Sequence, residues 1–231
     1  MREAVILAGG LGTRLRSAVP DLPKPMAPVA GRPFLEILLG SLQSKGFGRA
    51  VLSLGYMSDS VVDHFGSSYR GLELDYVIES EPLGTGGALR LALSHCVSDH
   101  AFVFNGDTYL DLEIEELAAS WLSRQHPIIV ARHVADTTRY GRLLTSEGRV
   151  VRFEGSGIGG EGLINAGCYV LSTRMLENLP LPERFSFEQD FLSEAVRSEC
   201  FDLFVSKGSF IDIGVPEDYM RAQHDLRDVA R

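Results

Sequence analysis

The residues that best combine chemistry with close spacing lie near the start of the chain, in Gly9-Gly10-Leu11-Gly12-Thr13-Arg14 and Pro23-Lys24-Pro25. The glycines follow an apolar run that is typical of a buried strand, and they let the backbone turn tightly and approach a ligand closely. Arg14 supplies a bidentate guanidinium and Lys24 a point charge, so backbone amides and two cations can converge on one anion. This pattern predicts a polyphosphate site, and a nucleotide is the simplest ligand for it.

Two common glycine-rich nucleotide motifs are excluded by spacing. A P-loop requires Gly-Lys-Ser/Thr at a fixed distance from its first glycine, and neither Gly9 nor Gly10 is followed in this way. A dinucleotide fingerprint requires a third glycine where Leu15 stands, and an acidic ribose ligand further along for which there is no clear candidate. A glycine-rich turn without a ligand is the alternative for an isolated Gly-x-Gly. The added Thr13, Arg14 and Pro-Lys-Pro disfavour that alternative.

Two carboxylates each end an apolar segment and form a candidate metal site. Asp107 follows Ala101-Phe102-Val103-Phe104-Asn105-Gly106, and Asp212 lies in Phe210-Ile211-Asp212-Ile213-Gly214. Magnesium prefers a few carboxylates together with phosphate oxygens and retained waters. An isolated Asn-Gly-Asp is more often a turn with a local hydrogen bond. The second carboxylate favours the metal site.

Composition and charge bound the class of protein. The 231 residues carry a net charge of −9, which argues against a nucleic-acid partner because such surfaces are usually basic. We find no apolar run of transmembrane length and no room for a signal peptide before the first strand, so a membrane partner is not expected. The cysteines and histidines show no disulfide or zinc spacing, and the sequence therefore predicts a cytoplasmic protein. The three cysteines are Cys96, Cys168 and Cys200.

Apolar strands alternate with helical patterns through the first half of the chain, which is typical of βαβ units. The expected strands are residues 3–8, 49–55, 73–78, 101–105 and 127–133, and the expected helices are 33–45, 58–65, 86–95 and 112–123. Further strands are expected at 149–153 and 163–171, separated by a loop or hairpin connection at 155–160. A helix is expected to start near Ser186, where Ser186 and Gln189 fit a capping box. Sites in such sheets lie at the carboxyl ends of the strands, where three of the motifs converge.

Gly9-Gly10-Leu11-Gly12-Thr13-Arg14-Leu15 together with Pro23-Lys24-Pro25-Met26-Ala27-Pro28-Val29 resembles the signature of the sugar-1-phosphate nucleotidyltransferases. Residues 15–24 and 185–192 make the chain most similar to the D-glycero-α-D-manno-heptose-1-phosphate guanylyltransferases within that family. The resemblance implies an α/β fold with one Rossmann-like domain over residues 1–231, whose mixed, mainly parallel sheet is flanked by helices (GT-A-like). It also implies a nucleotide-binding half at about 1–110 and a sugar-binding half at about 111–231.

The family implies an activity and a role for each matching residue. A sugar 1-phosphate would attack the α-phosphorus of a nucleoside triphosphate, releasing pyrophosphate and a nucleotide-diphosphate sugar. The expected catalytic residues are Arg14 and Lys24, and the expected Mg²⁺ ligands are Asp107 and Asp212. The expected nucleotide-binding residues are Leu7, Ala8, Gly9, Gly10, Gly12, Thr13, Glu79, Glu81, Gly84 and Thr85. The expected sugar-binding residues are Asn105, Gly141, Glu154, Asn165 and Glu188.

Base and sugar specificity have weaker signals than the reaction. Guanine presents two adjacent donors that one carboxylate can accept, so Glu79 or Glu81 would favour GTP, although either also fits a solvated turn. Asn165 can donate to and accept from sugar hydroxyls, or can form a bulge before the next strand. The 185–192 segment, with Glu188, also fits an amphipathic helix start whose phenylalanines lie in the core.

One position departs from the family pattern, because many relatives place a lysine after the glutamate at Glu154 and this chain has Gly155. Lys207 or Arg142 would then contact the sugar phosphate, or its binding would be weakened. Mannose-1-phosphate guanylyltransferase, sugar-1-phosphate uridylyltransferase and a non-catalytic subunit that senses nucleotide sugars remain alternatives. The sequence leaves open whether the chain forms a homo-oligomer.

Overall fold

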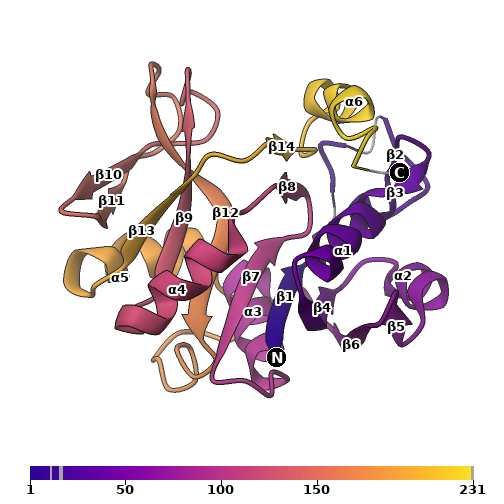
Figure 1. The fold of residues 1–231 in the computed structure, drawn as a ribbon, viewed down its shortest axis with the longest axis horizontal. Helices are drawn as coiled ribbons and strands as arrows, with labels where there is room; N and C mark the ends of the chain where they lie inside the picture. The colour runs from indigo at the N-terminus through magenta and orange to yellow at the C-terminus, as the bar shows by residue number, and fades with distance from the viewer. Residues whose placement is uncertain (11, 16–17, 230–231) are drawn as a thin grey trace.

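The chain folds around a central ten-stranded sheet in the computed structural model, which describes residues 1–10, 12–15 and 18–229. The strand order is β10-β11-β13-β9-β12-β7-β1-β4-β6-β5. Strands β7, β1, β4 and β6 run parallel, and β9 and β13 share their direction on the other side of antiparallel β12. The sheet is therefore mixed and mostly parallel, as predicted (Figure 1).

The first half of the chain alternates strands and helices. Its strands are β1 (Arg2–Leu7), β4 (Phe47–Leu54), β5 (Ser68–Tyr69), β6 (Leu72–Ile78) and β7 (His100–Asn105). Its helices are α1 (Phe34–Ser44), α2 (Ser58–Phe65) and α3 (Gly84–Ser94). Strand β5 was not predicted. The other elements, together with α4 (Ile114–Arg124) and β9 (Ile128–Val134), confirm the predicted strands and helices to within two residues at each end.

The second half completes the sheet with strands that reverse direction. They are β10 (Leu143–Ser146), β11 (Arg149–Phe153), β12 (Gly162–Ser172) and β13 (Asp202–Ser206), with α5 (Ser193–Ser198) before β13. The predicted strands at 149–153 and 163–171 are confirmed. The segment 155–160 is a loop but not a hairpin connection, because β11 pairs with β10 and β13 whereas β12 pairs with β9 and β7.

Small elements that the sequence patterns did not predict join distant parts of the chain. They are a 3-10 turn at Lys24–Met26, β2 (Pro28–Val29), β3 (Arg32–Pro33), β8 (Thr108–Leu110), β14 (Phe210–Asp212) and α6 (Pro216–Asp225). Strand β8 pairs with β14, and β2 pairs with β3. Tyr219 of α6 donates a hydrogen bond to the Pro28 carbonyl at 2.7 Å, so the last helix rests on the segment after the glycine loop.

The predicted helix start at Ser186 is confirmed, but its cap differs from the prediction. The segment Phe187–Leu192 forms a π-helix, and the Ser186 hydroxyl accepts from the Gln189 amide at 3.2 Å. The reciprocal bond runs from the Ser186 amide to the carboxylate of Asp190, not to Gln189. A π-helix is wider than an α-helix. Asp190, four residues after Ser186, therefore accepts the hydrogen bond that the third residue, Gln189, would accept in a capping box.

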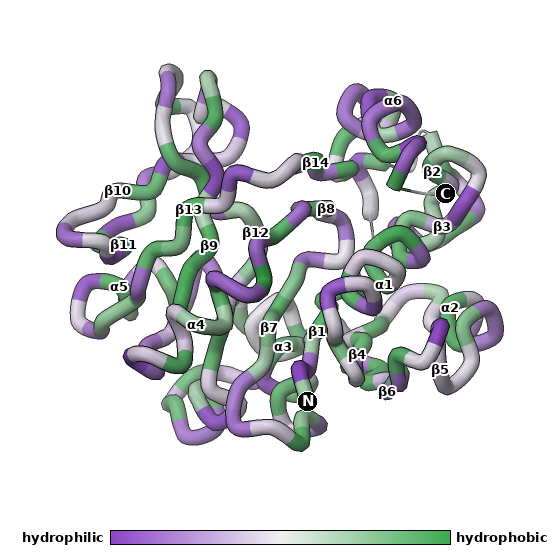
Figure 2. Tube along the Cα trace, viewed as in Figure 1, coloured by the Kyte–Doolittle hydropathy of each residue, from purple (hydrophilic) through white to green (hydrophobic). Residues whose placement is uncertain are grey.

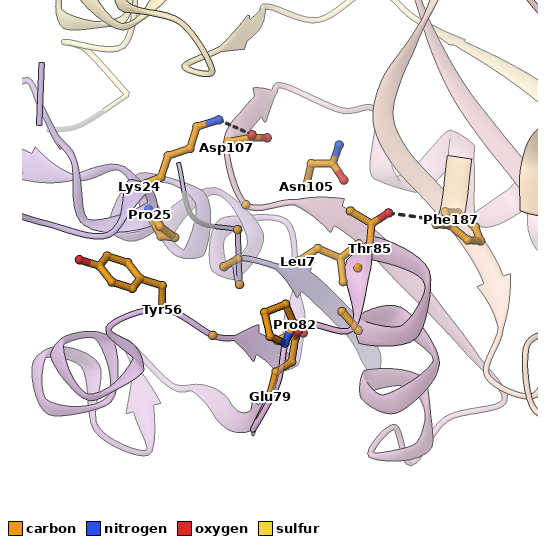
Figure 3. A pocket seen from close by; sticks show the side chains of 18 of the residues that line it. Leu7, Lys24, Pro25, Tyr56, Glu79, Pro82, Thr85, Asn105, Asp107 and Phe187 are labelled. Carbon is orange, nitrogen blue, oxygen red and sulfur yellow. Dashed lines mark hydrogen bonds and ion pairs between the residues drawn. The ribbon is translucent and has the colours of Figure 1, made fainter. Parts of the chain in front are cut away.

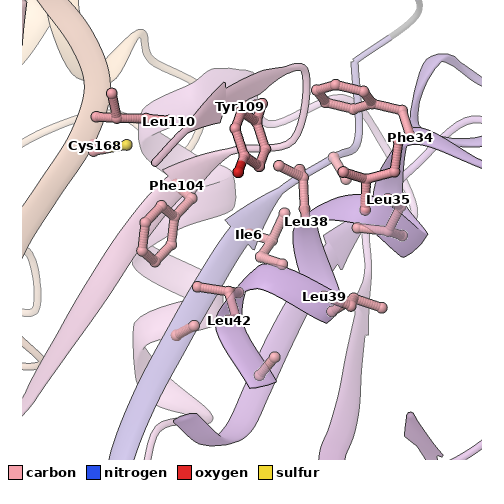
Figure 4. Packing of buried hydrophobic residues seen from close by; sticks show 14 of the residues in the cluster. Ile6, Phe34, Leu35, Leu38, Leu39, Leu42, Phe104, Tyr109, Leu110 and Cys168 are labelled. Carbon is pink, nitrogen blue, oxygen red and sulfur yellow. The ribbon is translucent and has the colours of Figure 1, made fainter. Parts of the chain in front are cut away.

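Two hydrophobic layers pack on opposite faces of the sheet, because alternate residues of each strand point to opposite sides. The hydrophobic cluster on one face contains Ile6 and residues of α1, α2, α4 and α6. The cluster on the other face contains Val5 and residues of α3, α5 and the π-helix. Figure 4 shows Leu38 of α1 next to Ile6 of β1. The strands are largely hydrophobic and the outer loops hydrophilic (Figure 2). Within the described ranges, the helices are all too short or too polar to span a membrane.

Candidate active site

A cleft of about 570 Å³ opens at the carboxyl ends of β1, β4, β6 and β7. The three motifs expected at strand ends all reach it, and Figure 3 shows their side chains around one hollow. Of the predicted nucleotide-binding residues, those that line the cleft are Leu7, Ala8, Gly9, Gly10, Glu79, Glu81, Gly84 and Thr85. The other side of the cleft is formed by Asn105, Asp107 and residues of the second half of the chain.

Neighbouring chain segments closely approach Gly9 after β1 and Gly106 after β7. A Cβ at Gly9 would lie 2.8 Å from Oε1 of Glu79, and one at Gly106 would lie 2.8 Å from the Leu7 carbonyl oxygen. At Gly10 nothing lies within 4 Å, so its backbone faces open space in the cleft wall. These packing distances agree with a backbone that a ligand can approach.

The remaining residues of the first motif lie beside the cleft and do not line it. Gly12 has a left-handed φ of 58°, and a Cβ there would lie 3.1 Å from the Lys24 Cβ. Thr13 and Arg14 are exposed. Leu11 and Arg16, another cation of the motif, lie outside the described residues.

Lys24 points into the cleft and forms an ion pair with Asp107 (Figure 3). Its backbone lies in the 3-10 turn between buried Pro23 and Pro25, and only 11% of its side chain is exposed. Prolines fix the backbone on both sides of the lysine, which explains why its side chain has a defined direction. Of the two alternatives for Pro-Lys-Pro, the structure agrees with an inward-aimed lysine over a solvated connector.

Asp212 is brought beside Asp107 by the pairing of β8 with β14. Asp212 pairs with Thr108, and the Ile213 amide donates to the Asp107 carbonyl at 2.9 Å. A Cβ at Gly214 would lie 2.8 Å from Oδ1 of Asp212 and 3.3 Å from Nζ of Lys24. Two short strands thus gather two carboxylates and one ammonium from distant parts of the sequence.

The electrostatics of Asp212 fit a cation site. Burial raises the pKa of the Asp212 carboxyl above its ordinary range, and the charge of Asp107 raises it further. Lys24 and Arg14 act in the opposite direction, which places Arg14 within electrostatic reach of this carboxylate. Two carboxylates that repel each other across a partly buried site are an oxygen donor set of the kind that Mg²⁺ prefers. Asp107 and Asp212 therefore fit the predicted metal.

The segment after β6 is shaped by its own side chains. Oε2 of Glu79 accepts from the Leu83 amide at 2.9 Å, so this carboxylate closes the turn before α3. The Thr85 hydroxyl accepts from the Phe187 amide at 2.9 Å, which joins the segment to the π-helix (Figure 3). Glu81 is exposed and lines the cleft.

On the opposite wall, one hydrogen-bonded group joins three of the polar side chains. Oε1 of Glu188 accepts from Nδ2 of Asn165 at 2.9 Å and from the Tyr169 hydroxyl at 2.9 Å. The Asn165 amide also donates to the Tyr169 oxygen at 2.7 Å. The Glu188 residue as a whole is exposed, but burial of its carboxyl group raises the pKa of that group. The hydrogen bond from Tyr169 lowers this pKa, and the charge of Asp107 raises it. Glu188 therefore lies close to the candidate metal ligands.

Asn105 and Asn165 come together at an irregularity of β12. The pairing of β12 with β9 shifts between Asn165 and Cys168, and Gly167 has a left-handed φ of 67°. A Cβ at Gly167 would lie 2.5 Å from Nδ2 of Asn105. Asn165 therefore lies at a bulge, as one of the two alternatives predicted, and it donates to Glu188; its contact with a sugar hydroxyl stays a prediction.

Gly141 and Glu154 lie together but outside the cleft lining. A Cβ at Gly141, whose φ is 78°, would lie 2.6 Å from the Glu154 carbonyl oxygen. The adjacent Arg139 and Tyr140 feel the charge of Asp212, one of the two candidate metal ligands. The pKa of Arg139 is raised mainly by its ion pair with Asp218, and the pKa of Tyr140 is raised mainly by burial. The charge of Asp212 raises both pKa values further.

The position that departs from the family pattern is exposed. Gly155 has open space around it, because a Cβ placed there would have nothing within 4 Å. Arg142 donates to the Gly159 carbonyl at 2.9 Å and thereby holds the 155–160 loop, and Lys207 is exposed beside Glu113. Neither cation lines the cleft, and which residue contacts a sugar phosphate stays a prediction. The pKa of Arg139, which was not among the predicted site residues, is raised in part by the charge of Asp212.

Several cleft residues were missed by sequence reasoning. Ser53 lies near the end of β4, Gly55 and Tyr56 follow that strand, and all three line the cleft. Their position at the carboxyl end of a predicted strand was a usable signal. Tyr169 and Phe187 also line the cleft. They had no such signal, because their apolar neighbours make them look like ordinary core residues.

A model of the nucleotidyl transferase family matches residues 3–229. The chain belongs to the nucleotidyl transferase family. This assignment confirms the resemblance inferred from the glycine and Pro-Lys-Pro motifs, and with it the prediction of an enzyme.

Curated relatives cover almost the whole chain. The D-glycero-α-D-manno-heptose 1-phosphate guanylyltransferase of Aneurinibacillus thermoaerophilus is 40% identical over 97% of this chain and 98% of its own length. The protein of the same name from Campylobacter jejuni is 38% identical over 94% and 96%. A mannose-1-phosphate guanylyltransferase of Mycobacterium tuberculosis is 34% identical over 97% of this chain but only 64% of its own length.

Solved structures agree with these relatives. HddC from Yersinia pseudotuberculosis complexed with GMP-PN is 41% identical, with a TM-score of 0.87 over 98% of this chain and all of that one. UDP-glucose pyrophosphorylase complexed with UDP-glucose has a TM-score of 0.82 at 18% identity, which shows a shared fold alone. The predicted nucleotidyltransferase fold is therefore confirmed.

Proposed function

We propose that the protein transfers GMP from GTP to D-glycero-α-D-manno-heptose 1-phosphate, giving a nucleotide-diphosphate sugar and pyrophosphate. The observation that carries the proposal is the placement of Lys24, Asp107 and Asp212 between the glycine loop and the Asn165–Glu188 group. Family membership and near full-length relatives named as heptose guanylyltransferases support this choice of substrates.

The reaction needs positioning and charge neutralisation more than acid–base chemistry. A phosphate oxygen of the sugar 1-phosphate, already ionised, forms a new bond to the α-phosphorus of GTP. The bond from the α-phosphorus to the bridging oxygen breaks, and pyrophosphate leaves with that oxygen. Lys24, inside the cleft, neutralises the reacting phosphates, and Arg14, at its edge, balances charge that develops on the leaving pyrophosphate.

Asp107 and Asp212 would hold Mg²⁺, which when bound would neutralise phosphate charge during the transfer. Their oxygen-only donor set and mutual repulsion support this assignment. Because Lys24 is paired with Asp107, its ammonium lies next to the position where those phosphates must enter.

For the base we propose Glu81 as the residue that reads guanine. Its carboxylate would accept from the N1–H and N2 amine together, a pair of donors that uracil and thymine do not offer. Glu79 instead accepts from the Leu83 amide and shapes the turn that presents Glu81.

For the sugar we propose the Asn165–Glu188 group together with Asn105. The Tyr169 hydroxyl and Asn165 amide both donate to Glu188 and so hold its carboxylate in place. Gly141 and Glu154 belong to the same half and would contact the sugar across Tyr140. We further propose that residues 1–231 form a single domain with these two halves, and that the protein is cytoplasmic.

Pyrophosphate release in the presence of Mg²⁺ tests the proposal directly. GTP, ATP, UTP, CTP and dTTP are each combined with heptose, mannose and glucose 1-phosphates. We expect turnover with GTP and heptose 1-phosphate. Turnover with mannose 1-phosphate or UTP instead would keep the reaction and replace the specificity. Nucleotide binding without release in any combination would identify a sensing subunit and refute the enzyme.

A further inference from the structure

A second group of chemistry-bearing side chains lies at the amino edge of the sheet. His126, Cys200 and Asp202 place one ligand atom each within 4.8 Å of the others, and they are the one such group of three among the described residues. Nδ1 of His126 lies 3.3 Å from Sγ of Cys200 and 3.6 Å from Oδ1 of Asp202, and Sγ lies 3.8 Å from the same oxygen. The cleft plays no part in this cluster.

Adjacent parallel strands place the three residues together. His126 precedes β9 and Cys200 precedes β13, and Asp202 pairs with Ile128. The Asp202 amide also donates to the Pro127 carbonyl at 2.8 Å. The strand pairing therefore fixes the backbone of both loops where the ligand atoms meet. Figure 1 shows α4 and α5, which lead into these loops, on the side of the molecule opposite α2.

The distances fit tetrahedral zinc. With metal–ligand lengths of about 2.0–2.1 Å to nitrogen, about 2.0–2.2 Å to oxygen and about 2.3 Å to sulfur, ligand atoms in such a site lie about 3.4–3.6 Å apart. The three observed separations of 3.3, 3.6 and 3.8 Å fall within a few tenths of an ångström of these values. A small movement of side chains would complete the geometry.

Asp202 supplies an independent indication of a missing ligand. The residue is 3% exposed, and its Oδ2 is buried without a hydrogen-bond partner in the described chain. Oδ1 has long contacts: 3.4 Å to Nη1 of Arg124, whose side chain is mostly exposed, 3.6 Å to Nδ1 of His126 and 3.8 Å to Sγ of Cys200. A buried carboxylate oxygen normally has a partner, because leaving it unpaired is costly. A cation held by both carboxylate oxygens of Asp202 would satisfy Oδ2 together with Oδ1, the oxygen that faces His126 and Cys200.

We propose that His126, Cys200 and Asp202 bind Zn²⁺, with the fourth position open to solvent. Thiolate and imidazole ligands favour zinc over the hard Mg²⁺ assigned to the cleft. On binding, the Cys200 thiol loses its proton to solvent and its sulfur bonds the metal, while the Nδ1 lone pair of neutral His126 and the carboxylate complete the set. The ion ties the loop between α4 and β9 to the loop between α5 and β13. It stabilises the sugar-binding half without taking part in the reaction.

Cobalt substitution tests the site without an activity assay. Protein treated with a chelator and dialysed is titrated with Co²⁺, and we expect a thiolate-to-cobalt charge-transfer band that saturates at one equivalent. Cys200→Ser should remove the band. Cys96→Ser, which changes a thiol outside the cluster, should leave it intact. Excess Zn²⁺ should abolish the band and raise the melting temperature of the wild type and of Cys96→Ser, but not of Cys200→Ser.

A titration without a charge-transfer band, or a band that survives Cys200→Ser, would overturn the proposal. If Cys200→Ser fails to fold, His126→Gln serves as the second variant because His126 is partly exposed. It should lower Co²⁺ affinity at least tenfold, and unchanged affinity would equally refute the site.

Discussion

Asp107 has more acidic than basic side chains around it. Lys24 forms the ion pair, while Asp212 and Glu188 both have a pKa raised in part by the charge of Asp107. Burial is the largest cause for both carboxyls. The site therefore stores unfavourable charge in the free protein, which phosphate-bound cations would relieve.

The cost of that stored charge gives a stability prediction for Asp212. A carboxyl whose folded pKa is raised contributes stability below its unfolded pKa and loses it as the pH rises through the folded value. Asp212→Asn does not titrate, so it should be more stable than the wild type near neutral pH, by about 1 kcal/mol or about 2–4 °C in melting temperature. The advantage should vanish below the ordinary pKa of aspartate.

Melting temperatures of both proteins from pH 3 to pH 8 check this sign. The exposed Asp63→Asn on α2 serves as the matched control and should show no such pH-dependent gain. A melting temperature for Asp212→Asn that is lower than that of the wild type at pH 7 would contradict the account.

Arg14 is exposed and near Asp212, which makes it a clean test of the proposed catalysis. Arg14→Ala should lower kcat/KM by about 10²–10³-fold, because a cation that stabilises developing charge is removed. Its melting temperature should stay within about 1 °C of the wild type, since surface substitutions change the free energy of unfolding by less than about 0.5 kcal/mol. Arg197→Ala, an exposed arginine on α5, is the control. Equal kcat/KM in both variants would remove Arg14 from the mechanism.

Gly155 allows the departure from the family to be tested by restoration. Its φ is not left-handed and open space surrounds it, so a lysine fits without strain. Gly155→Lys should lower the KM for the sugar 1-phosphate about tenfold, as expected for a charge-assisted hydrogen bond. Gly155→Gln adds similar bulk without charge. If both variants change KM equally, charge at this position is irrelevant to phosphate binding.

At the scale of elements, the strands and helices with strong periodicity were predictable and the short pairings were not. The buried run at 3–8 and the amphipathic pattern of α1 have local signals. Strands β8 and β14 are three residues each and are distant in sequence, and nothing local indicates that they pair. Both carboxylates were identified from their flanking apolar residues, but their proximity depends on this pairing.

The amino end of the parallel strands contains a buried charge network that supports the opposite edge. Arg49 of β4 forms ion pairs with fully buried Glu3 of β1 and with Asp75 of β6, the latter at 2.7 Å. Glu3 also accepts from the Val97 and Ser98 amides. The network therefore connects three strands with the turn after α3.

Arg49→Ala would leave the Glu3 carboxylate buried without its ion-pair partner. We expect a loss of about 3–5 kcal/mol in the free energy of unfolding, measured from the urea midpoint and slope. Glu73→Gln removes an exposed partner of the same arginine and should cost less than about 1 kcal/mol. Similar losses for the two variants would mean that burial of Glu3 is not the source of the effect.

At the scale of the whole molecule, ligand binding in a cleft built from both halves should stabilise the entire fold. GTP with Mg²⁺ at about 100 times its Kd should add about 2.7 kcal/mol, or about 5–10 °C in melting temperature. UTP at the same concentration should give a smaller shift, because it lacks the paired donors proposed for Glu81. Glu81→Ala should bring the two shifts together. Identical shifts for GTP and UTP in the wild type would refute guanine recognition.

The seam between α3 and the segment before the π-helix has a consequence for protein engineering. A Cβ at Gly84 would lie 2.5 Å from the Phe185 carbonyl oxygen, one at Gly86 would lie 2.1 Å from the Phe185 ring, and one at Gly87 would lie 2.3 Å from the Glu183 carbonyl oxygen. The space that side chains would need at these three glycines is occupied by the segment that leads to Glu188. A chimera that imports the proposed base-reading loop from a relative must therefore import residues 183–188 with it, so the proposed base and sugar specificities would be transferred together.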